Sequence, residues 1–448
     1  MIPMDKVLTW KAHLTEPHMR EMLLGSAAGL TIKVLAALSL FAMNVVVTRT
    51  VGASEAGLFF LGFTLVTIVA TVGRVGLDQA VVKFVATEYA CGAFGKVHSV
   101  YRKAVSWAVF ATAILALTLW LNAAWVTDSI FSIEGFEPVL NVMVIAAPFI
   151  AVYIIHAQAL QGLKRISKSM LVSSVCLPAG ILAAILVFPV TTAYDLSKYF
   201  VIASMITVVI GRFFWKQSVS NASLAPPSVS HDAAFISSSL LRKTCMPLWT
   251  VAIVHQVIQW SSQLMLGVWE DAQSIAFFAT AQRTAMLTSF ILFAVNSIAA
   301  PKFAVMYNSG DHDGLKRLAL LSVKMMMLVA VPTTLFILIF PEWLMRMFGD
   351  EFVAASTALM ILALGQFVNI ATGSVGYLLS MTGNEVKVRD NMLISGALTI
   401  ILGVALIPAF GVIGAAIAYA CGVSSQNLLC VYQVNKQLGF NTLLFWKA

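Results

Sequence analysis

The sequence predicts an all-α polytopic membrane protein of about twelve transmembrane helices, arranged as two six-helix lobes related by a parallel repeat. Three observations support this fold class: the composition, the spacing of the apolar segments and the distribution of basic residues. Hydrophobic residues make up 60% of the 448 positions, and charged residues only 11%. Because soluble chains average about 25% charged residues, this composition excludes a water-soluble domain.

The apolar segments repeatedly reach the roughly 20 residues that a helix needs to cross about 30 Å of hydrocarbon. In the first lobe the predicted spans are 24–48, 56–82, 101–124, 138–162, 169–189 and 196–213. In the second lobe they are 245–268, 274–300, 317–340, 355–381, 391–408 and 411–434. The predicted organisation is therefore an N-terminal segment 1–23, a first lobe 24–213, a cytoplasmic linker 214–244, a second lobe 245–434 and a C-terminal tail 435–448.

Basic residues gather in alternate loops of this arrangement. With the amino terminus inside, the inner loops hold the pairs Arg102–Lys103, Lys164–Arg165 and Arg242–Lys243. This is the asymmetry that the positive-inside rule requires. We therefore expect a multi-pass protein of the bacterial inner (cytoplasmic) membrane with both termini in the cytoplasm. The net charge of +8 then reflects loops that face anionic lipid headgroups, and nucleic acid is not an expected partner.

A weak internal repeat relates the two lobes. Residues 89–105 align with 307–323 at a shift of 218, which places Tyr89 over Tyr307 and Gly92 over Gly310. Because each lobe has an even number of spans, both lobes begin on the same side of the membrane. Such parallel repeats are typical of alternating-access transporters.

The five cysteines are scattered and form no CxxC pair. We expect neither a disulfide framework nor a metal site. No cofactor is expected beyond a coupling ion, H⁺ or Na⁺.

Three basic residues, Lys33, Arg74 and Arg283, fall inside predicted spans. Each lies nine residues from the nearest end of its span or from the basic residue that bounds it, which corresponds to a depth of about 13 Å. A cation at the bilayer centre costs about 2.5 to 3.5 kcal/mol on an insertion scale, so we expect all three to face a wet cavity between the lobes. The alternative is that each side chain snorkels to an interface.

Asp78 follows Arg74 by four residues, so that a continuous helix would bring the two side chains together on one face. Asp78 is then either an orienting partner that neutralises Arg74 or a protonatable coupling group.

Span seven carries a polar stripe. His255, Gln256, Gln259 and Gln263 recur at helical spacing, and Gln366 and Asn369 repeat the pattern in span ten. As a set, these amides suit a hydroxyl-rich anionic substrate in a cationic cavity. Singly, each is explained by interhelical hydrogen bonds of about 0.6 kcal/mol, and we interpret His255 and His156 as helix contacts rather than proton carriers.

The stretch "NVVVTRTVGASEAGLFFLGFTLVTIVATVGRVGLDQAVVKFVA" (44–86) contains an RxxGxxxxG turn formed by Arg49, Gly52 and Gly57. It resembles the polysaccharide-transport branch of the multidrug/oligosaccharidyl-lipid/polysaccharide (MOP) exporter superfamily, similar to Wzx-type O-antigen flippases. The resemblance implies a fold like that of the MATE transporters and the lipid II flippase. It also implies translocation of an undecaprenyl-pyrophosphate-linked oligosaccharide, an O-antigen or exopolysaccharide repeat unit, from the inner to the outer leaflet. The related lipid II flippase carries cations in its first, second and eighth spans, which are the spans of Lys33, Arg74 and Arg283.

The expected partners are the lipid-linked oligosaccharide, membrane lipids, and a polysaccharide polymerase and glycosyltransferases of the same pathway. Two other functions stay open. A multidrug/cation antiporter on the same scaffold would place acids in the cavity, and Asp78 is the clearest intramembrane carboxylate. A membrane enzyme acting on lipid-linked glycans would need carboxylates at an outer mouth, for which Glu134, Glu137, Glu270 and Asp271 are the candidates.

Overall fold

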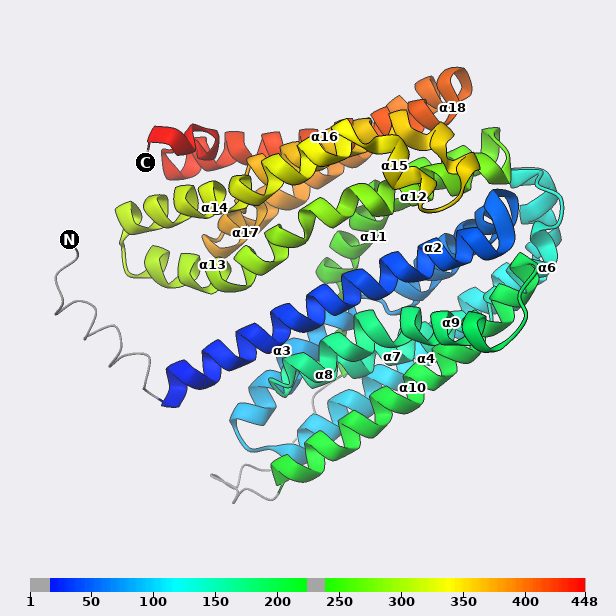
Figure 1. Cartoon of the computed structure of the whole chain (residues 1–448). Coiled ribbons are helices and arrows are strands. Elements are labelled where there is room, and N and C mark those ends of the chain that lie inside the picture. The colour runs from blue at the N-terminus through cyan, green and yellow to red at the C-terminus, as the bar shows by residue number, and fades with distance from the viewer. Residues whose placement is uncertain (1–16, 224–237, 448) are drawn as a thin grey trace.

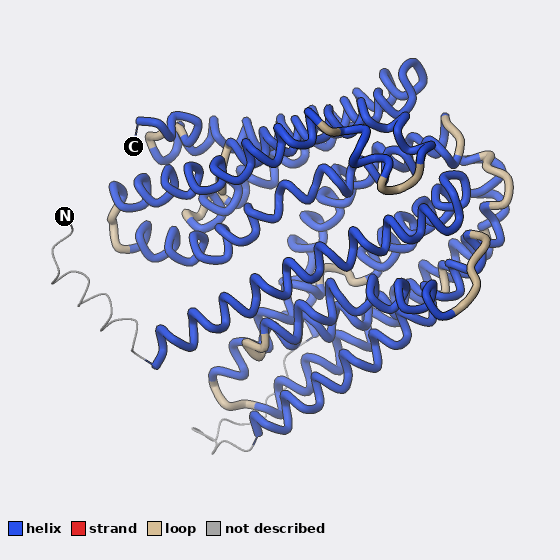
Figure 2. Tube along the Cα trace, viewed as in Figure 1, coloured by secondary structure: helices blue, strands red, loops and turns tan. Residues whose placement is uncertain are grey.

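A computed structural model describes residues 17–223 and 238–447, and these residues form helices and no strands (Figure 2). The first lobe consists of α2 (Pro17–Gly73), α3 (Leu77–Ala90), α4 (Phe94–Leu121), α5 (Ala123–Trp125), η1 (Val126–Phe131), α6 (Phe136–Met143), α7 (Ala146–Gly162), α8 (Ile166–Met170), η2 (Leu171–Val175), α9 (Cys176–Val187) and α10 (Ala193–Ser223). The second lobe consists of α11 (Ser238–Trp269), α12 (Ala272–Met286), η3 (Leu287–Ser289), α13 (Phe290–Asn308), α14 (His312–Ile339), α15 (Pro341–Arg346), η4 (Asp350–Ala355), α16 (Ser356–Ala371), α17 (Val375–Met381), α18 (Glu385–Leu438) and η5 (Thr442–Lys447).

Eight helices of the described ranges are long and apolar enough to cross a membrane, and the bent pair α6–α7 makes a ninth. Two of the eight, α2 and α18, each contain two predicted spans joined at a glycine with positive φ, Gly52 (77°) and Gly411 (52°). The polar span seven corresponds to α11. Each predicted span therefore has its own helix, helix limb or broken helix, and the predicted fold class is confirmed.

The start of α2, the end of α10 and the short η5 lie at one end of the molecule, which we call the basic end (Figure 1). The turns at Gly52 and Gly411 lie at the opposite end, which we call the acidic end. The linker predicted at 214–244 is narrower than expected, because α10 continues to Ser223 and α11 begins at Ser238. The sequence offers no helix breaker before Pro226. Residues 224–237 of the linker and residues 1–16 of the N-terminal segment lie outside the described residues.

The two lobes pack together through α2. One buried apolar cluster includes Phe59 and Phe60 of α2 as well as Phe278 and Phe352 of the second lobe. At the same contact, a Cβ on Gly57 would overlap the backbone carbonyl of Ala272 at the start of α12. A glycine is therefore required here for the helices to approach this closely.

Hydrogen bonds join the lobes at the acidic end. Arg49 donates from Nε to the carbonyl of Met347 (2.6 Å) and from Nη2 to that of Arg346 (3.2 Å). The backbone N–H of Ala53 donates to Oε1 of Glu351 (2.7 Å). The RxxGxxxxG motif thus has a physical role in each of its parts: Arg49 bonds to the other lobe, Gly52 makes the turn and Gly57 allows close packing.

A test of this contact is Gly57→Ala, with Gly95→Ala as the matched control. Both glycines are helical, so both substitutions gain the same helix propensity, but a Cβ on Gly95 meets nothing within 4 Å. Overpacking a close contact costs about 1 to 3 kcal/mol. We expect Gly57→Ala to lower the thermal unfolding midpoint of the purified protein and Gly95→Ala to leave it unchanged or raise it. Equal midpoints for the two variants would contradict the contact.

Candidate functional site

The second predicted span is broken in its middle. α2 ends at Gly73 and α3 begins at Leu77, and Val75 (φ 48°) and Gly76 (φ 73°) between them adopt the left-handed conformation. A β-branched residue rarely takes such a φ. Arg74 therefore lies in a turn rather than on a helical face, which corrects the expectation that Arg74 and Asp78 share one continuous helix. The sequence signal for the break is the pair of glycines in "GRVG".

The predicted ion pair nevertheless forms across this turn. Nε of Arg74 donates to Oδ1 of Asp78 over 2.7 Å, and Nη2 donates to the Thr71 hydroxyl over 3.1 Å. Arg74 is only 7% exposed. Asp78 lies in the first turn of α3, where the helix dipole favours a negative charge. In this geometry the carboxylate of Asp78 holds the guanidinium of Arg74.

The second lobe supports the broken backbone. The indole N–H of Trp249 in α11 donates to the carbonyl of Val72 over 3.0 Å. A Cβ on Gly76 would overlap the carbonyl oxygen of Cys245, one turn earlier in α11. Irregular backbone at membrane depth is tolerated only where protein or a wet cavity satisfies its polar groups, and α11 supplies the protein partner here.

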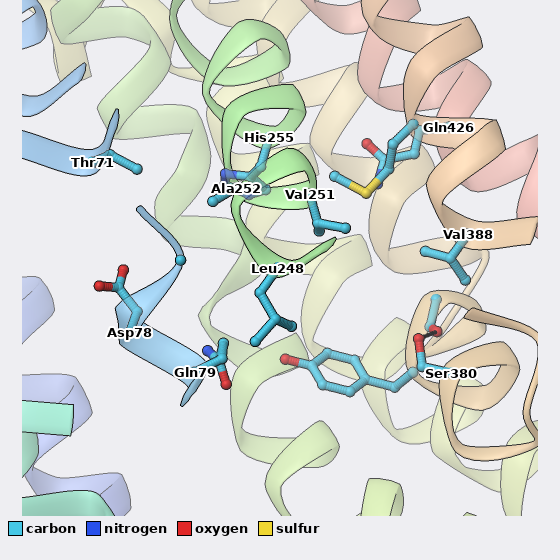
Figure 3. A pocket seen from close by; sticks show the side chains of 14 residues that line it. Thr71, Asp78, Gln79, Leu248, Val251, Ala252, His255, Ser380, Val388 and Gln426 are labelled. Atoms are coloured by element: carbon cyan, nitrogen blue, oxygen red, sulfur yellow. Dashed lines mark hydrogen bonds between the residues drawn. The ribbon is translucent and has the colours of Figure 1, made fainter. Parts of the chain in front are cut away.

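A cavity of about 520 Å³ lies beside the break, between the two lobes and toward the basic end (Figure 3). Helix α11 and the α17–α18 region of the second lobe form its other walls. Its lining residues are Thr71, Gly76, Asp78, Gln79, Leu248, Val251, Ala252, His255, Gly376, Tyr377, Ser380, Val388, Met392 and Gln426. Asp78 is the charged residue among them, so the lining combines apolar and polar side chains and carries a carboxylate rather than a cation.

The two histidines that the sequence singled out differ in their surroundings. His255 is exposed and lines the cavity. His156 is 1% exposed, with Nδ1 2.6 Å from the carbonyl of Val152 and Nε2 3.1 Å from the hydroxyl of Tyr101. Because a carbonyl only accepts, Nδ1 carries the proton, and a neutral ring accepts from Tyr101 at Nε2. His156 is thus a helix contact, whereas His255 is available to a ligand.

The glutamines of span seven join helices rather than line the cavity. Gln256 donates to the hydroxyl of Thr71 (3.2 Å), and the buried Gln263 donates to the carbonyl of Phe60 (3.1 Å). Both are contacts between the lobes. Gln259 instead approaches the sulfur of Met286 within its own lobe (3.4 Å).

The polar pair of span ten is also internal to the second lobe. Oε1 of Gln366 accepts hydrogen bonds from the Ser289 hydroxyl (2.5 Å) and from the amide of Asn369 (3.1 Å). Neither residue of the pair lines the described cavity.

Arg283 on α12 reaches across to the first lobe. Its Nη1 donates to Oδ1 of Asn44 over 2.6 Å, and its guanidinium carbon lies 4.0 Å from the ring centroid of Phe60. Within residues 17–223 and 238–447, no carboxylate oxygen lies within 4 Å of its nitrogens. An amide and an aromatic face therefore hold this cation in place of a counter-ion.

The three intramembrane cations lie at different levels. Asn44 and Phe60 mark the level of Arg283 on the two limbs of α2. Along these limbs, Lys33 is eleven residues closer to the basic end than Asn44, or about 16 Å, and Arg74 is fourteen residues closer than Phe60, or about 21 Å. The expected common depth is therefore corrected, because α2 begins before the first predicted span and α3 continues past the end of the second.

Five polar residues of the cavity were not predicted as site residues: Thr71, Gln79, Tyr377, Ser380 and Gln426. Gln79 directly follows Asp78. Tyr377 and Ser380 are one turn apart on the short α17, which begins after a second break at Gly373 (φ 81°). In the sequence, the glycines that break the helices beside Gln79 and Tyr377 were the feature that could have indicated these site residues.

Comparison with known proteins gives a family match and relatives of similar length. The MatE family model matches residues 247–409, within the second lobe. The chain is 25% identical over 394 residues to "Probable low-salt glycan biosynthesis flippase Agl15" of Haloferax volcanii, covering 85% of this chain and 76% of that protein. It is 20% identical over 434 residues to "Uncharacterized membrane protein MJ1068" of Methanocaldococcus jannaschii, covering 90% and 82%.

Solved structures share the fold over nearly the whole chain. A structure described as the lipid II flippase MurJ in an inward closed conformation has a TM-score of 0.71 at 14% identity, covering 92% of this chain and 87% of that one. A multidrug resistance MATE transporter in an inward-facing conformation has a TM-score of 0.70 at 15% identity, covering 94% and 99%. These likenesses show that the chain shares the fold of the MATE transporter and of MurJ over nearly its whole length, and the MatE family model matches a part of its second lobe.

The Arg74–Asp78 pair can be tested with a double-mutant cycle. We expect Arg74→Gln and Asp78→Asn each to lower the free energy of unfolding by about 1 to 3 kcal/mol, because each leaves a half-buried charge without its partner. The double variant should lose less than the sum of the two, by about 0.5 to 3 kcal/mol. Additive losses, measured by thermal or denaturant unfolding in one detergent, would contradict the coupling.

Proposed function

We propose that the chain is a flippase that moves an undecaprenyl-pyrophosphate-linked oligosaccharide, an O-antigen or exopolysaccharide repeat unit, from the inner to the outer leaflet. The proposed mechanism is alternating access coupled to an H⁺ or Na⁺ gradient. The support comes from the fold, the similarity to a protein named as a glycan flippase, and the cation Arg283, which reaches from the second lobe to the first.

The observation that carries the proposal is Arg283. It lies between the lobes and is held by Asn44 and Phe60 without a carboxylate within 4 Å in the described part of the chain. A diphosphate must lose its water to cross the membrane, and this loss is the main barrier to its crossing. A fixed guanidinium lowers the barrier, because its charge-assisted hydrogen bonds to phosphate are stronger than hydrogen bonds between neutral groups.

The cavity suits the glycan part of such a substrate. His255, Gln79 and Ser380 offer donors and acceptors for sugar hydroxyls, and Tyr377 offers an aromatic face. Lys33 on α2 and Arg74 in the turn after α2 lie toward the basic end, where a diphosphate arriving from the inner leaflet would first meet positive charge.

Asp78 provides a route for proton coupling. While its carboxylate is ionised, it occupies the guanidinium of Arg74 at 2.7 Å. Protonation of Asp78 would remove that competitor and free Arg74 for a phosphate oxygen.

A second candidate function is a multidrug/cation antiporter of the same superfamily. It is favoured by one observation, that Asp78 is the charged residue in the lining of the described cavity. A cationic drug would pair with Asp78, whereas a diphosphate would be repelled by it unless it were protonated.

We further propose that the protein lies in the bacterial inner membrane with the basic end, and hence both termini, in the cytoplasm. There it would take its substrate from glycosyltransferases and deliver it to a polysaccharide polymerase.

The proposal predicts the effect of removing the cations in a reconstituted flipping assay with a fluorescent undecaprenyl-pyrophosphate-linked glycan. Arg283→Gln and Lys33→Gln should each reduce the flipping rate about tenfold or more, because each removes a charge-assisted contact of about 1.5 to 3 kcal/mol. Arg389→Gln, which removes an exposed cation paired with Asp390, is the control and should retain the wild-type rate. Wild-type flipping by both Arg283→Gln and Lys33→Gln would overturn the proposal.

Asp78→Asn separates the two candidate functions. An antiporter should lose efflux of a cationic dye such as ethidium and show no flipping, because the neutral amide no longer pairs with the dye. A flippase should show no dye efflux in the wild type, and its flipping rate in the variant should no longer respond to an imposed pH gradient. Flipping that still follows the gradient would rule out Asp78 as the proton carrier.

A further inference from the structure

The guanidinium of Arg283 has unused hydrogen-bonding capacity. A guanidinium carries N–H donors on each of its nitrogens, and here Nη1 donates to Oδ1 of Asn44 over 2.6 Å. Among the residues that the structure describes, Nε and Nη2 of Arg283 have no hydrogen-bond partner. Arg74 differs, because neighbouring side chains occupy the same two nitrogens. Of these two arginines, Arg283 is therefore the one that has donors available to a ligand.

Aromatic rings stabilise the charge of Arg283 without taking those donors. Its guanidinium carbon lies 4.0 Å from the ring centroid of Phe60 and 5.5 Å from that of Phe63. Both rings attract a cation, but neither accepts a hydrogen bond in the plane of the guanidinium. Arg283 is half-buried, so this edge can be reached from between the lobes. A phosphate is commonly bound at such an edge by two parallel N–H donors.

Asn44 presents a fixed and neutral oxygen to this cation. Its Nδ2 donates to the carbonyl of Leu40, one turn earlier in α2, over 2.7 Å, which directs Oδ1 toward Arg283. Asn44 is only 2% exposed. The hydrogen bond that a neutral amide oxygen accepts is weaker than one accepted by an anionic oxygen. A phosphate oxygen is therefore the stronger acceptor for the same guanidinium.

We propose that Asn44 is a positioning residue whose amide oxygen substitutes for a phosphate oxygen of the substrate while the site is empty, an inference that rests on the proposed function. The amide keeps the guanidinium directed between the lobes. It also leaves the positive charge uncompensated, since no carboxylate oxygen of the described residues lies within 4 Å of Arg283. A phosphate oxygen then replaces Oδ1, and the donors on Nε and Nη2 bind a second oxygen. An aspartate in this place would instead form an ion pair that the substrate has to break.

Asn44→Asp and Asn44→Ala test this role in opposite directions. The full-length protein in phosphatidylcholine nanodiscs is titrated with undecaprenyl diphosphate, and its thermal unfolding midpoint is measured without ligand. Asn44→Asp should have the higher midpoint of the two variants, because a carboxylate keeps the bond between the lobes and a methyl group loses it. The affinities should run in the opposite order. We expect Asn44→Asp to weaken binding about tenfold or more, and Asn44→Ala to bind within about threefold of the wild type or more tightly.

Asn122→Asp and Asn122→Ala are the matched controls. Nδ2 of Asn122 also donates to the carbonyl four residues earlier, that of Thr118, over 2.7 Å, but Asn122 is exposed at the end of α4. The same changes of charge and size are therefore made far from Arg283 in the sequence and outside its contacts. Both control variants should bind undecaprenyl diphosphate within about twofold of the wild type.

A purely structural Asn44 would make affinity follow stability. The proposal is overturned by binding that Asn44→Ala weakens more than about threefold, by binding that Asn44→Asp retains within about threefold, or by a lower midpoint for Asn44→Asp than for Asn44→Ala. The first result decides even where Asn44→Asp does not fold. Failure of the proposed function looks different, because the wild type would then bind no diphosphate and Arg283→Gln would flip normally.

Exchanging phosphatidylcholine for phosphatidylglycerol in the nanodiscs distinguishes the substrate from an ordinary anionic lipid, since both carry phosphate oxygens. We expect the affinity of the wild type for undecaprenyl diphosphate to change less than about threefold, because the headgroup of phosphatidylglycerol stays at the interface and Arg283 lies in the membrane interior. Displacement of the diphosphate by phosphatidylglycerol would assign the guanidinium to bilayer lipid and contradict the role proposed for Asn44.

Discussion

The close packing of α2 on the second lobe is the contact on which the rest of the molecule depends. At the acidic end Gly57 packs on Ala272 and Arg49 bonds to the carbonyls after α15. At the level of Asn44, Arg283 crosses to the first lobe. At the basic end the broken turn packs on α11. Two limbs of one helix thus fix the relative position of the lobes along their whole length, and any change in access must alter these contacts.

The membrane explains why the contacts of α2 are of such different kinds. Close to the acidic end, water is available, and a charged side chain bonds to open carbonyls. In the interior an unpaired polar group costs several kcal/mol, and there Arg283 is paired with an amide and an aromatic ring while Gln263 reaches the carbonyl of Phe60. Of the polar residues that the sequence marked as a substrate stripe, Gln256 and Gln263 hold the lobes together, whereas Gln259, Gln366 and Asn369 bond within the second lobe.

The fold could be predicted from the sequence because hydrophobic length and charge asymmetry act locally, and the membrane leaves helices as the one outcome for such segments. The site could be predicted only in part. The pairing of Arg74 with Asp78 was correct because their spacing in the chain nearly determines it. The break between them, and hence the cavity lined by Gln79 and Ser380, depends on Trp249 and Cys245, which are far away in sequence. The depth of Arg283 relative to Lys33 depends on the length of α2. The apolar segments of the sequence do not determine that length.

The order of the charges along α2 has a consequence for the proposed transport cycle. A diphosphate that enters at the basic end meets Lys33 and Arg74 first, and Arg283 lies about 16 to 21 Å farther on. Arg283 is engaged with Asn44 while the lobes are joined at the acidic end. In the proposed cycle, opening that end would separate α2 from α12, and this would break the hydrogen bond between Arg283 and Asn44 and expose the guanidinium. The same movement that opens the acidic end would therefore free Arg283, the cation nearest to that end. The site with the highest affinity for the headgroup would then shift from the basic end to the acidic end as the acidic end opens.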